Sequence, residues 1–195
     1  MSNPAIILAA GEARRFGRPK QCAEFGDRSL LERAVATVRA ARLEPLVVLG
    51  AHREAVESEL DETCRRVVAE EWEEGMGASI RRAARAISPD EIQRVTVVAC
   101  DQPLVTHLDL RLLNQKCATA DAAAAVYEGV AGIPACFDAR MLGELEELEG
   151  DRGARWVLRG DEYRVAAVPM DHAGVDIDTP DDLEELTSTD NRGSR

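Results

Sequence analysis

Residues 4–20 read PAIILAAGEARRFGRPK, in which an apolar run passes directly into a loop of small and basic residues. A short, continuous apolar run is typical of a strand that is covered on both faces, as in a parallel sheet. Two further runs of this kind, at residues 45–50 and 94–100, are separated by stretches of helical period. The sequence therefore predicts a three-layer α/β/α fold, in which helices cover both faces of an open, mostly parallel sheet.

Local patterns predict the other elements. Apolar residues repeat with helical i, i+3, i+4 spacing over residues 29–42, where Ser29 and Glu32 complete a capping-box pattern. Further strands are predicted at residues 121–127, 133–137 and 164–169, with a turn at 129–132, a helix at 141–148 and a final helix opening at Thr179-Pro180.

The chain has 195 residues, about the length of one domain. We expect the domain to span residues 1–186, and the polar residues 187–195 to form a disordered tail. The five cysteines are odd in number and include no Cys-x-x-Cys pair, which indicates free thiols in a reducing cytoplasm. No apolar run reaches the roughly 18 residues that a membrane span needs. We therefore expect a cytoplasmic protein without a membrane partner.

Charge is distributed unevenly along the chain. The 24 basic and 36 acidic residues give a net charge of −12, which argues against nonspecific binding to nucleic acid. Residues 11–22 nevertheless contain four cations and one acid, a local charge of +3. Their small residues let backbone N–H groups approach an anion, and Arg15 and Lys20 can reach its oxygens. A solvated basic turn would have the same composition. The spacing does not fit a Walker A loop, because Lys20 is not followed by Ser or Thr.

Acidic residues gather in two other places. The strand at residues 94–100 ends at Asp101, which places a carboxylate at the edge where open α/β sheets bind ligands. A turn or helix-cap aspartate would read the same way. Residues 171–185 hold seven acids and no Lys or Arg, among them Asp176 and Asp178. We expect only one of these two to face the site fully, and favour Asp176.

The loop at residues 8–20 resembles the signature of the MobA-like nucleotidyltransferase superfamily. It matches at Leu8, Ala9, Ala10, Gly11, Arg15, Gly17 and Lys20, and departs at Ala13, where serine is usual. The resemblance implies a Rossmann-like nucleotidyltransferase fold of GT-A type. It also implies that this loop binds a nucleoside triphosphate, with Arg15 and Lys20 on the phosphates as catalytic residues.

The acidic stretches extend the resemblance. Asp101-Gln102-Pro103 is similar to the strand end that binds metal in this family, and the stretch from Asp176 to Leu183 is similar to the segment that closes its active site. The resemblance implies a Mg²⁺ ion held by Asp101 and Asp176, with Asp178 as the weaker candidate.

Three stretches resemble the molybdenum cofactor cytidylyltransferases within this superfamily. Residues 72–80, which include Gly75 and Ser79, are similar to a nucleotide-binding loop of that group. Residues 132–134 resemble its Gly-His-Pro, with isoleucine in place of histidine, and residues 150–155 match its Gly-Asp-x-Gly-Ala-Arg. The acceptor-binding residues that this resemblance implies are Gly132, Asp151, Gly153 and Arg155. Taken without the family, residues 150–155 read as an ordinary loop before a helix.

The expected reaction is transfer of CMP from CTP to the terminal phosphate of molybdopterin, with release of pyrophosphate. The same transfer from GTP, or onto another phosphorylated small molecule, is the nearest alternative. A noncatalytic nucleotide-binding chaperone for a molybdoenzyme is the alternative of a different class. A molybdoenzyme or its chaperone would then be the protein partner.

Overall fold

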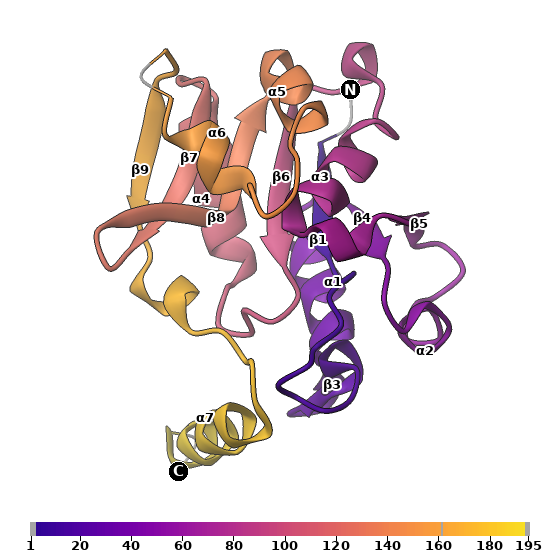
Figure 1. Cartoon of the computed structure of the whole chain (residues 1–195). Coiled ribbons are helices and arrows are strands. Elements are labelled where there is room, and N and C mark those ends of the chain that lie inside the picture. The colour runs from indigo at the N-terminus through magenta and orange to yellow at the C-terminus, as the bar shows by residue number, and fades with distance from the viewer. Residues whose placement is uncertain (1–2, 161, 194–195) are drawn as a thin grey trace.

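The computed structural model describes residues 3–160 and 162–193, which are organised around a seven-stranded sheet (Figure 1). The strands lie in the order β5-β4-β1-β6-β8-β7-β9, and β8 alone runs antiparallel to its two neighbours. The strands are β1 (Pro4–Leu8), β4 (Glu44–Leu49), β5 (Arg65–Val68), β6 (Arg94–Ala99), β7 (Ala122–Tyr127), β8 (Val130–Asp138) and β9 (Val165–Pro169). The predicted α/β fold with a mostly parallel sheet is confirmed.

Helices cover both faces of this sheet. One face packs against α3, α5 and α6, and the other against α1, α2 and α4. Their bounds are α1 (Leu30–Ala40), α2 (Arg53–Glu57), α3 (Met76–Ala84), α4 (His107–Cys117), α5 (Leu142–Glu146) and α6 (Ala154–Leu158). A small hairpin, β2 (Glu24–Phe25) with β3 (Arg28–Ser29), precedes α1, and α7 (Pro180–Gly193) follows the sheet.

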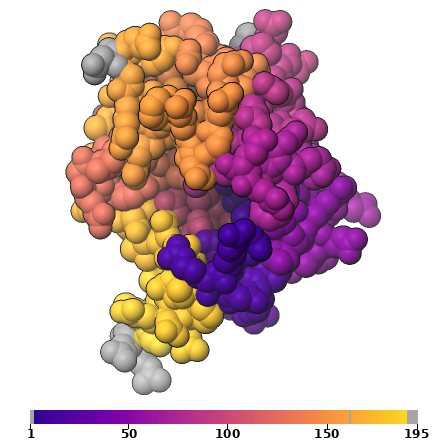
Figure 2. Space-filling model, in the orientation of Figure 1, coloured from indigo at the N-terminus to yellow at the C-terminus, as the bar shows by residue number. Residues whose placement is uncertain are grey.

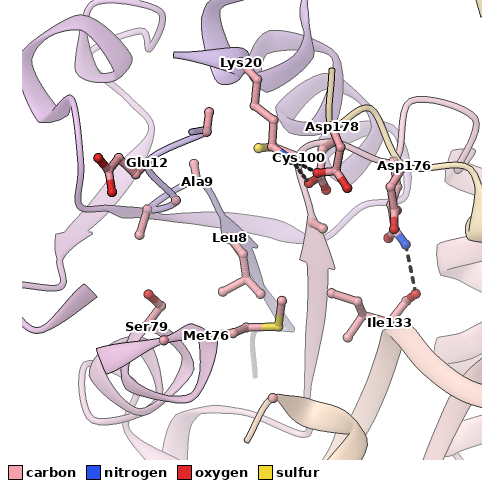
Figure 3. A pocket seen from close by; sticks show the side chains of 18 of the residues that line it. Leu8, Ala9, Glu12, Lys20, Met76, Ser79, Cys100, Ile133, Asp176 and Asp178 are labelled. Atoms are coloured by element: carbon pink, nitrogen blue, oxygen red, sulfur yellow. Dashed lines mark hydrogen bonds and ion pairs between the residues drawn. The ribbon is translucent and has the colours of Figure 1, made fainter. Parts of the chain in front are cut away.

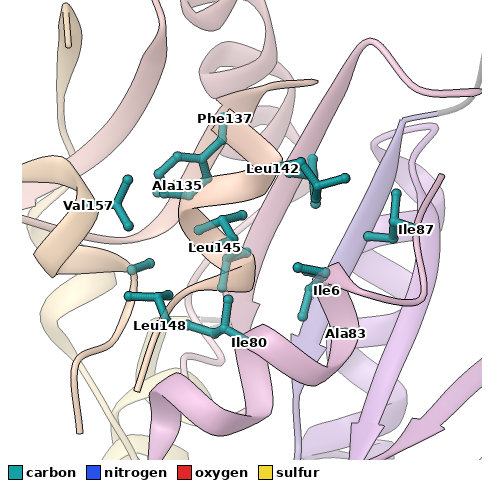
Figure 4. Close-up of a cluster of buried hydrophobic side chains, with 14 of the residues drawn as sticks. Ile6, Ile80, Ala83, Ile87, Ala135, Phe137, Leu142, Leu145, Leu148 and Val157 are labelled. Carbon is teal, nitrogen blue, oxygen red and sulfur yellow. The ribbon is translucent and has the colours of Figure 1, made fainter. Parts of the chain in front are cut away.

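Alternate residues of each strand enter different core layers. In β1, Ile6 packs with α3 and α5, as Figure 4 shows, whereas Ile7 packs with α1 and α4 on the opposite face. Both side chains are fully buried. Because the strand is covered on both sides, it requires apolar residues at every position rather than at every second one. This is the physical origin of the continuous apolar runs in the sequence.

The strand order creates the place for a site. From β1 the chain moves to β4 on one side, and it later returns to β6 on the other side of β1. The connections after β1 and β6 therefore diverge at the carboxyl edge of the sheet, the position at which open α/β sheets form ligand crevices. Loops that carry Gly11 and Asp101 begin at this edge.

Several local predictions are confirmed. Ser29 Oγ accepts a hydrogen bond from the Glu32 N–H, and the Glu32 carboxylate accepts one from the Ser29 N–H, so the capping box of α1 is present. Each of the five cysteines is a free thiol. Within the described ranges, no helix combines the length and apolar character that crossing a membrane requires.

Two local predictions differ from the structure. The turn expected at residues 129–132 is shorter, because Glu128 and Gly129 both adopt positive φ and join β7 to β8 directly. The tail expected to be disordered from Thr187 is helical as far as Gly193, and residues 194–195 lie outside the described residues. In α7 the hydroxyls of Thr187 and Thr189 donate to carbonyls four residues earlier, so these polar residues are compatible with a helix.

Candidate functional site

A cavity of about 730 Å³ lies at the carboxyl edge of the sheet, between the loops that follow β1 and β6. Figure 2 shows this hollow between the indigo N-terminal segment, the magenta segment around α3 and the orange segment around α6. The cavity is lined by every site residue that the sequence singled out: Leu8, Ala9, Ala10, Gly11, Arg15, Lys20, Gly75, Ser79, Asp101, Gly132, Asp151, Gly153, Arg155, Asp176 and Asp178.

Loop 9–20, which follows β1, presents its backbone to the cavity. The N–H groups of residues 10–13 donate no hydrogen bond to any other part of the described chain. The turn closes where the N–H groups of Phe16 and Gly17 both donate to the carbonyl of Ala13, which has φ 56°. Phe16 is buried in a small cluster that includes Ile177, and thus anchors the loop. The arrangement leaves successive N–H groups available to an anion.

Lys20 links the loop to the acidic side of the cavity. Its Nζ atom lies 2.6 Å from Asp101 Oδ2 and 2.8 Å from Asp178 Oδ1, and its side chain is 13% exposed. Figure 3 shows Lys20 reaching toward Asp178. Burial disfavours the charged lysine, but the two carboxylates outweigh this effect and raise the pKa of Lys20 above its ordinary value. Lys20 is thus a fixed cation at the edge of the sheet.

Asp178 carries a second ion pair, with Arg15 Nη2 2.6 Å from its Oδ2 atom. The bond from Lys20, together with the charge of Arg15, holds the pKa of Asp178 below its usual value. The expectation that only one of Asp176 and Asp178 faces the site is wrong, because both line the cavity. Side chains two residues apart on an extended segment lie on the same side, and the buried Ile177 between them points the other way.

Asp176 differs from Asp178 in its surroundings. Burial, and then the negative charges of Asp101 and Asp178, raise the pKa of Asp176 to about 6. Among the residues described by the structure, no lysine or arginine forms an ion pair with Asp176. Of the three carboxylates Asp101, Asp176 and Asp178, Asp176 is therefore the one whose negative charge has no ion-pair partner in the described part of the chain.

Two loops on the opposite side of the cavity contact one another. The Gly77 N–H donates to the carbonyl of Gly150 at 2.8 Å, which joins loop 72–79 to loop 150–155. Gly75 has φ 123°, and a Cβ atom there would collide with Asp151 and the Gly150 backbone. Gly75 and Gly77 are thus both required by the close approach of the two loops.

Arg155 completes the wall next to these loops. Its Nε atom donates to the Ala131 carbonyl at 3.1 Å, which holds the guanidinium beside β8. A Cβ atom at Gly132 would lie 3.4 Å from Arg155 Nη2 and 2.6 Å from the Tyr127 hydroxyl, so glycine makes room for both side chains. The predicted acceptor-binding residues are therefore neighbours in space.

Among known protein families, the model of the MobA-like NTP transferase domain matches residues 5–175 of this chain. The chain belongs to the MobA-like NTP transferase family. The match covers the loop after β1, the Asp101 strand end and both loops on the far side of the cavity.

Curated relatives of this MobA-like chain include two enzymes of different description. The bifunctional protein GlmU of Desulfitobacterium hafniense is 32% identical over 161 residues, which cover 80% of this chain and 33% of GlmU. A probable molybdenum cofactor guanylyltransferase of Bacillus velezensis is 31% identical over 117 residues, covering 60% of this chain and 56% of that protein. The chain thus spans about a third of GlmU and a little over half of the guanylyltransferase.

Solved structures resemble this MobA-like chain over nearly its whole length. Rv0371c of Mycobacterium tuberculosis is 27% identical with a TM-score of 0.84, covering 96% of this chain and 99% of that chain. A second structure of Rv0371c, described as a complex with manganese, is 25% identical with a TM-score of 0.80, covering 97% and 100%.

Gln21 is a site residue that the sequence analysis missed. Its side chain is buried, and its Nε2 atom donates to the carbonyls of Ala9 and Gly11 at 2.9 and 2.8 Å. These bonds hold the start of loop 9–20 in place. A single glutamine beside Lys20 has no spacing pattern, so nothing in the sequence marked it.

Replacing Gln21 by leucine is expected to loosen this loop. The two carbonyls lose their buried donor, which should lower the free energy of unfolding by about 2 kcal/mol and raise KM for the nucleotide. Denaturant unfolding and steady-state kinetics measure these two quantities. The exposed Gln115 on α4 provides the matched control, as Gln115→Leu should change neither. An unaltered nucleotide KM in Gln21→Leu would remove Gln21 from this positioning role.

Gly75→Ala is expected to separate loop 72–79 from loop 150–155. The added methyl group meets the Gly150 backbone at 2.7 Å, and the φ of 123° is unfavourable for alanine. The variant should lose about 2 kcal/mol or more of stability and most of its activity, as thermal unfolding and turnover assays would show. Gly143→Ala in α5, where a Cβ atom meets nothing within 4 Å, should keep wild-type activity and be at least as stable, because alanine favours a helix more than glycine does. Equal stability and turnover of Gly75→Ala and Gly143→Ala would show that close packing at Gly75 is not required.

Proposed function

We propose that this protein is a nucleotidyltransferase that transfers CMP from CTP to the terminal phosphate of molybdopterin or its metal-loaded form, and releases pyrophosphate. One observation carries the proposal. Loop 9–20, with N–H groups that are free within the described chain, lies in one cavity with Lys20, the Asp101 strand end and a second basic loop, residues 150–155. Two anionic substrates could thus be held at once, one on each side.

The residues suit phosphoryl chemistry that needs alignment and charge neutralisation. The N–H groups of residues 10–13 would hold the triphosphate, and Lys20 and Arg15, held by their carboxylate partners, would donate to its oxygens. A phosphate monoester with a second pKa near 6 is already largely anionic at neutral pH. The acceptor therefore needs no strong base to attack the α-phosphorus, and Arg155 would help to position it.

The carboxylates fit a divalent cation. In the described ranges, no three or more His, Cys, Asp or Glu side chains gather in a metal-binding geometry. Mg²⁺ in nucleotide sites, however, is commonly held by one or two carboxylates together with substrate phosphates. Asp101 and Asp176 would supply these carboxylates; burial and the nearby charges of Asp101 and Asp178, which raise the pKa of Asp176, support a cation there. When bound, the ion would neutralise charge on the phosphates.

This assignment predicts different effects at the two C-terminal aspartates. Asp176→Asn should raise the Mg²⁺ concentration needed for half-maximal activity about tenfold, because it removes a proposed ligand. Asp178→Asn should leave that concentration near the wild-type value, since Asp178 is already paired with Lys20 and Arg15. A Mg²⁺ titration of both variants measures this difference. The reverse order of effects would make Asp178 the metal ligand instead.

The choice of cytidine is supported by the resemblance of residues 72–80 to the cytidylyltransferase pattern. The guanylyltransferase relative favours GTP as the second candidate. A noncatalytic nucleotide-binding chaperone is opposed by the coexistence of Lys20, Arg15 and Asp101 at one cavity.

Pyrophosphate release with each of the four nucleoside triphosphates, with and without molybdopterin and Mg²⁺, tests the proposal. We expect release with CTP and the acceptor, and none after chelation of the metal. Release with GTP and the acceptor, but with none of the other three nucleoside triphosphates, would make the protein a guanylyltransferase. If a nucleotide raises the melting temperature and no combination yields product, transfer to molybdopterin is excluded and the noncatalytic nucleotide-binding alternative is favoured.

A further inference from the structure

The surface around α6 carries a basic and aromatic face, of which the proposed reaction uses Arg155 alone. Arg155 and Trp156 lie on α6, Arg152 lies just before the helix and Arg159 directly follows it, and all four are exposed. Trp156 is 54% exposed, although large aromatic side chains are usually mostly buried. In a chain with a net charge of −12, three exposed arginines around a tryptophan form a distinct surface.

Among residues 3–160 and 162–193, the arginines of this face are not ion-paired, although Arg152 and Trp156 also line a hollow that contains Glu144, Glu147 and Glu162. The Arg152 guanidinium lies 4.4 Å from the centre of the Trp156 ring, a cation–π arrangement that stiffens both side chains. Within the part of the chain that the structure describes, none of Arg152, Arg155 and Arg159 forms an ion pair. Eight other arginines in the described residues do form one, as Arg15 and Arg140 illustrate.

This face is continuous with the candidate active site. A shallow hollow of about 570 Å³ lies against it, lined by three arginines and two acids, Glu149 and Asp151. The hollow and the main cavity share Asp151, Gly153 and Arg155 as lining residues. Loop 150–155 is thus a ridge with one side toward the reaction site and the other toward Trp156. In Figure 1, α6 lies in front of the sheet, near β7 and β8.

We propose that Arg152, Trp156 and Arg159 form a distal subsite for the acceptor, in which a planar heteroaromatic ring stacks on Trp156. This inference rests on the proposed function. An acceptor whose phosphate is held by Arg155 would extend across the ridge, placing its far end on the indole. The two outer arginines would hold anionic or carbonyl oxygens of that end. The acceptor class is then a phosphate monoester of a planar heterocycle, and phosphorylated sugars or polyols would be poor substrates.

Acceptor kinetics test the subsite directly. Trp156→Leu should raise KM for a phosphorylated pterin about tenfold, a typical effect of losing one stacking contact, with unchanged kcat and nucleotide KM. Trp156→Phe, which keeps an aromatic ring, should recover most of the loss. For glycerol 3-phosphate, which has no ring, wild type and Trp156→Leu should be equally slow. Arg111→Gln, on the exposed side of α4, is the control for loss of an unrelated arginine and should match wild type.

A binding assay separates this inference from the proposed function. A pterin without phosphate should quench tryptophan fluorescence of the wild-type protein, and Trp156→Leu should abolish the saturable quenching while Trp72 remains. If wild type transfers nucleotide and Trp156→Leu keeps the wild-type acceptor KM, the subsite is overturned and the proposed function survives. If wild type transfers nucleotide to no acceptor, the proposed function fails, and quenching that depends on Trp156 still supports a heterocycle site on α6. Absence of such quenching overturns the subsite in either case.

Discussion

Lys20→Met is expected to lower the rate of nucleotidyl transfer about a thousandfold. Removal of one preorganised charge that stabilises a transition state commonly costs about a hundredfold to a thousandfold. Lys20 should lie at the upper end, since its side chain is largely buried and its charge is held by Asp101 and Asp178. Its loss also leaves these two carboxylates facing each other and the incoming triphosphate. Pyrophosphate release under saturating CTP and Mg²⁺ measures the effect.

The chain provides a close control for this variant, because its only other lysine is Lys116. Lys116 is exposed near the end of α4, and Lys116→Met should retain wild-type turnover. Circular dichroism and thermal unfolding would establish that Lys20→Met is folded. A folded Lys20→Met protein with wild-type turnover would exclude Lys20 from contact with the phosphates.

Asp101→Asn is expected to reduce turnover at least about a hundredfold and to raise the requirement for Mg²⁺. The amide has the same shape as the carboxylate, so the bond from the Ile177 N–H to the Asp101 carbonyl should persist and keep the strand end in place. What is lost is one negative charge, both for the proposed cation and for Lys20. A Mg²⁺ titration of the transfer rate, followed by CTP binding in the absence of metal, would separate these two roles.

The matched control for Asp101→Asn is Asp27→Asn, at the exposed turn between β2 and β3. This variant should behave as wild type. If Asp101→Asn retained both its rate and its Mg²⁺ dependence, the strand end after β6 would have no part in metal binding. The nucleotide loop would then have to act without a carboxylate from β6.

Much of the fold was predictable because its physical causes are local. The apolar runs at residues 4–9, 45–50 and 94–100 reflect burial of each strand on both faces, and the capping box at Ser29 depends on two residues three positions apart. The antiparallel insertion of β8 between β6 and β7 was not predictable. An apolar run is the same in either direction, and pairing of residues 94–97 with 135–138 depends on the tertiary fold.

The motif residues of the site could be predicted, but Gln21 and the contacts between the residues could not. The motifs identified the residues around the cavity, yet the bonds from Lys20 reach residues 81 and 158 positions away. No local spacing specifies such partners. The orientation of Asp176 and Asp178 was likewise decided by Ile177, whose burial against Phe16 turns the residues on either side of it toward the cavity.

The ion pair between Lys20 and Asp178 also has a consequence for biogenesis. Proteins emerge from the ribosome N-terminal part first, and Lys20 precedes Asp178 by 158 residues. The parallel strands β5-β4-β1-β6 are complete at Ala99, long before the acidic segment has been synthesised. A nascent chain therefore presents Arg15 and Lys20 without Asp178 until 158 further residues have been added after Lys20, and the cavity is completed only after the parallel part of the sheet.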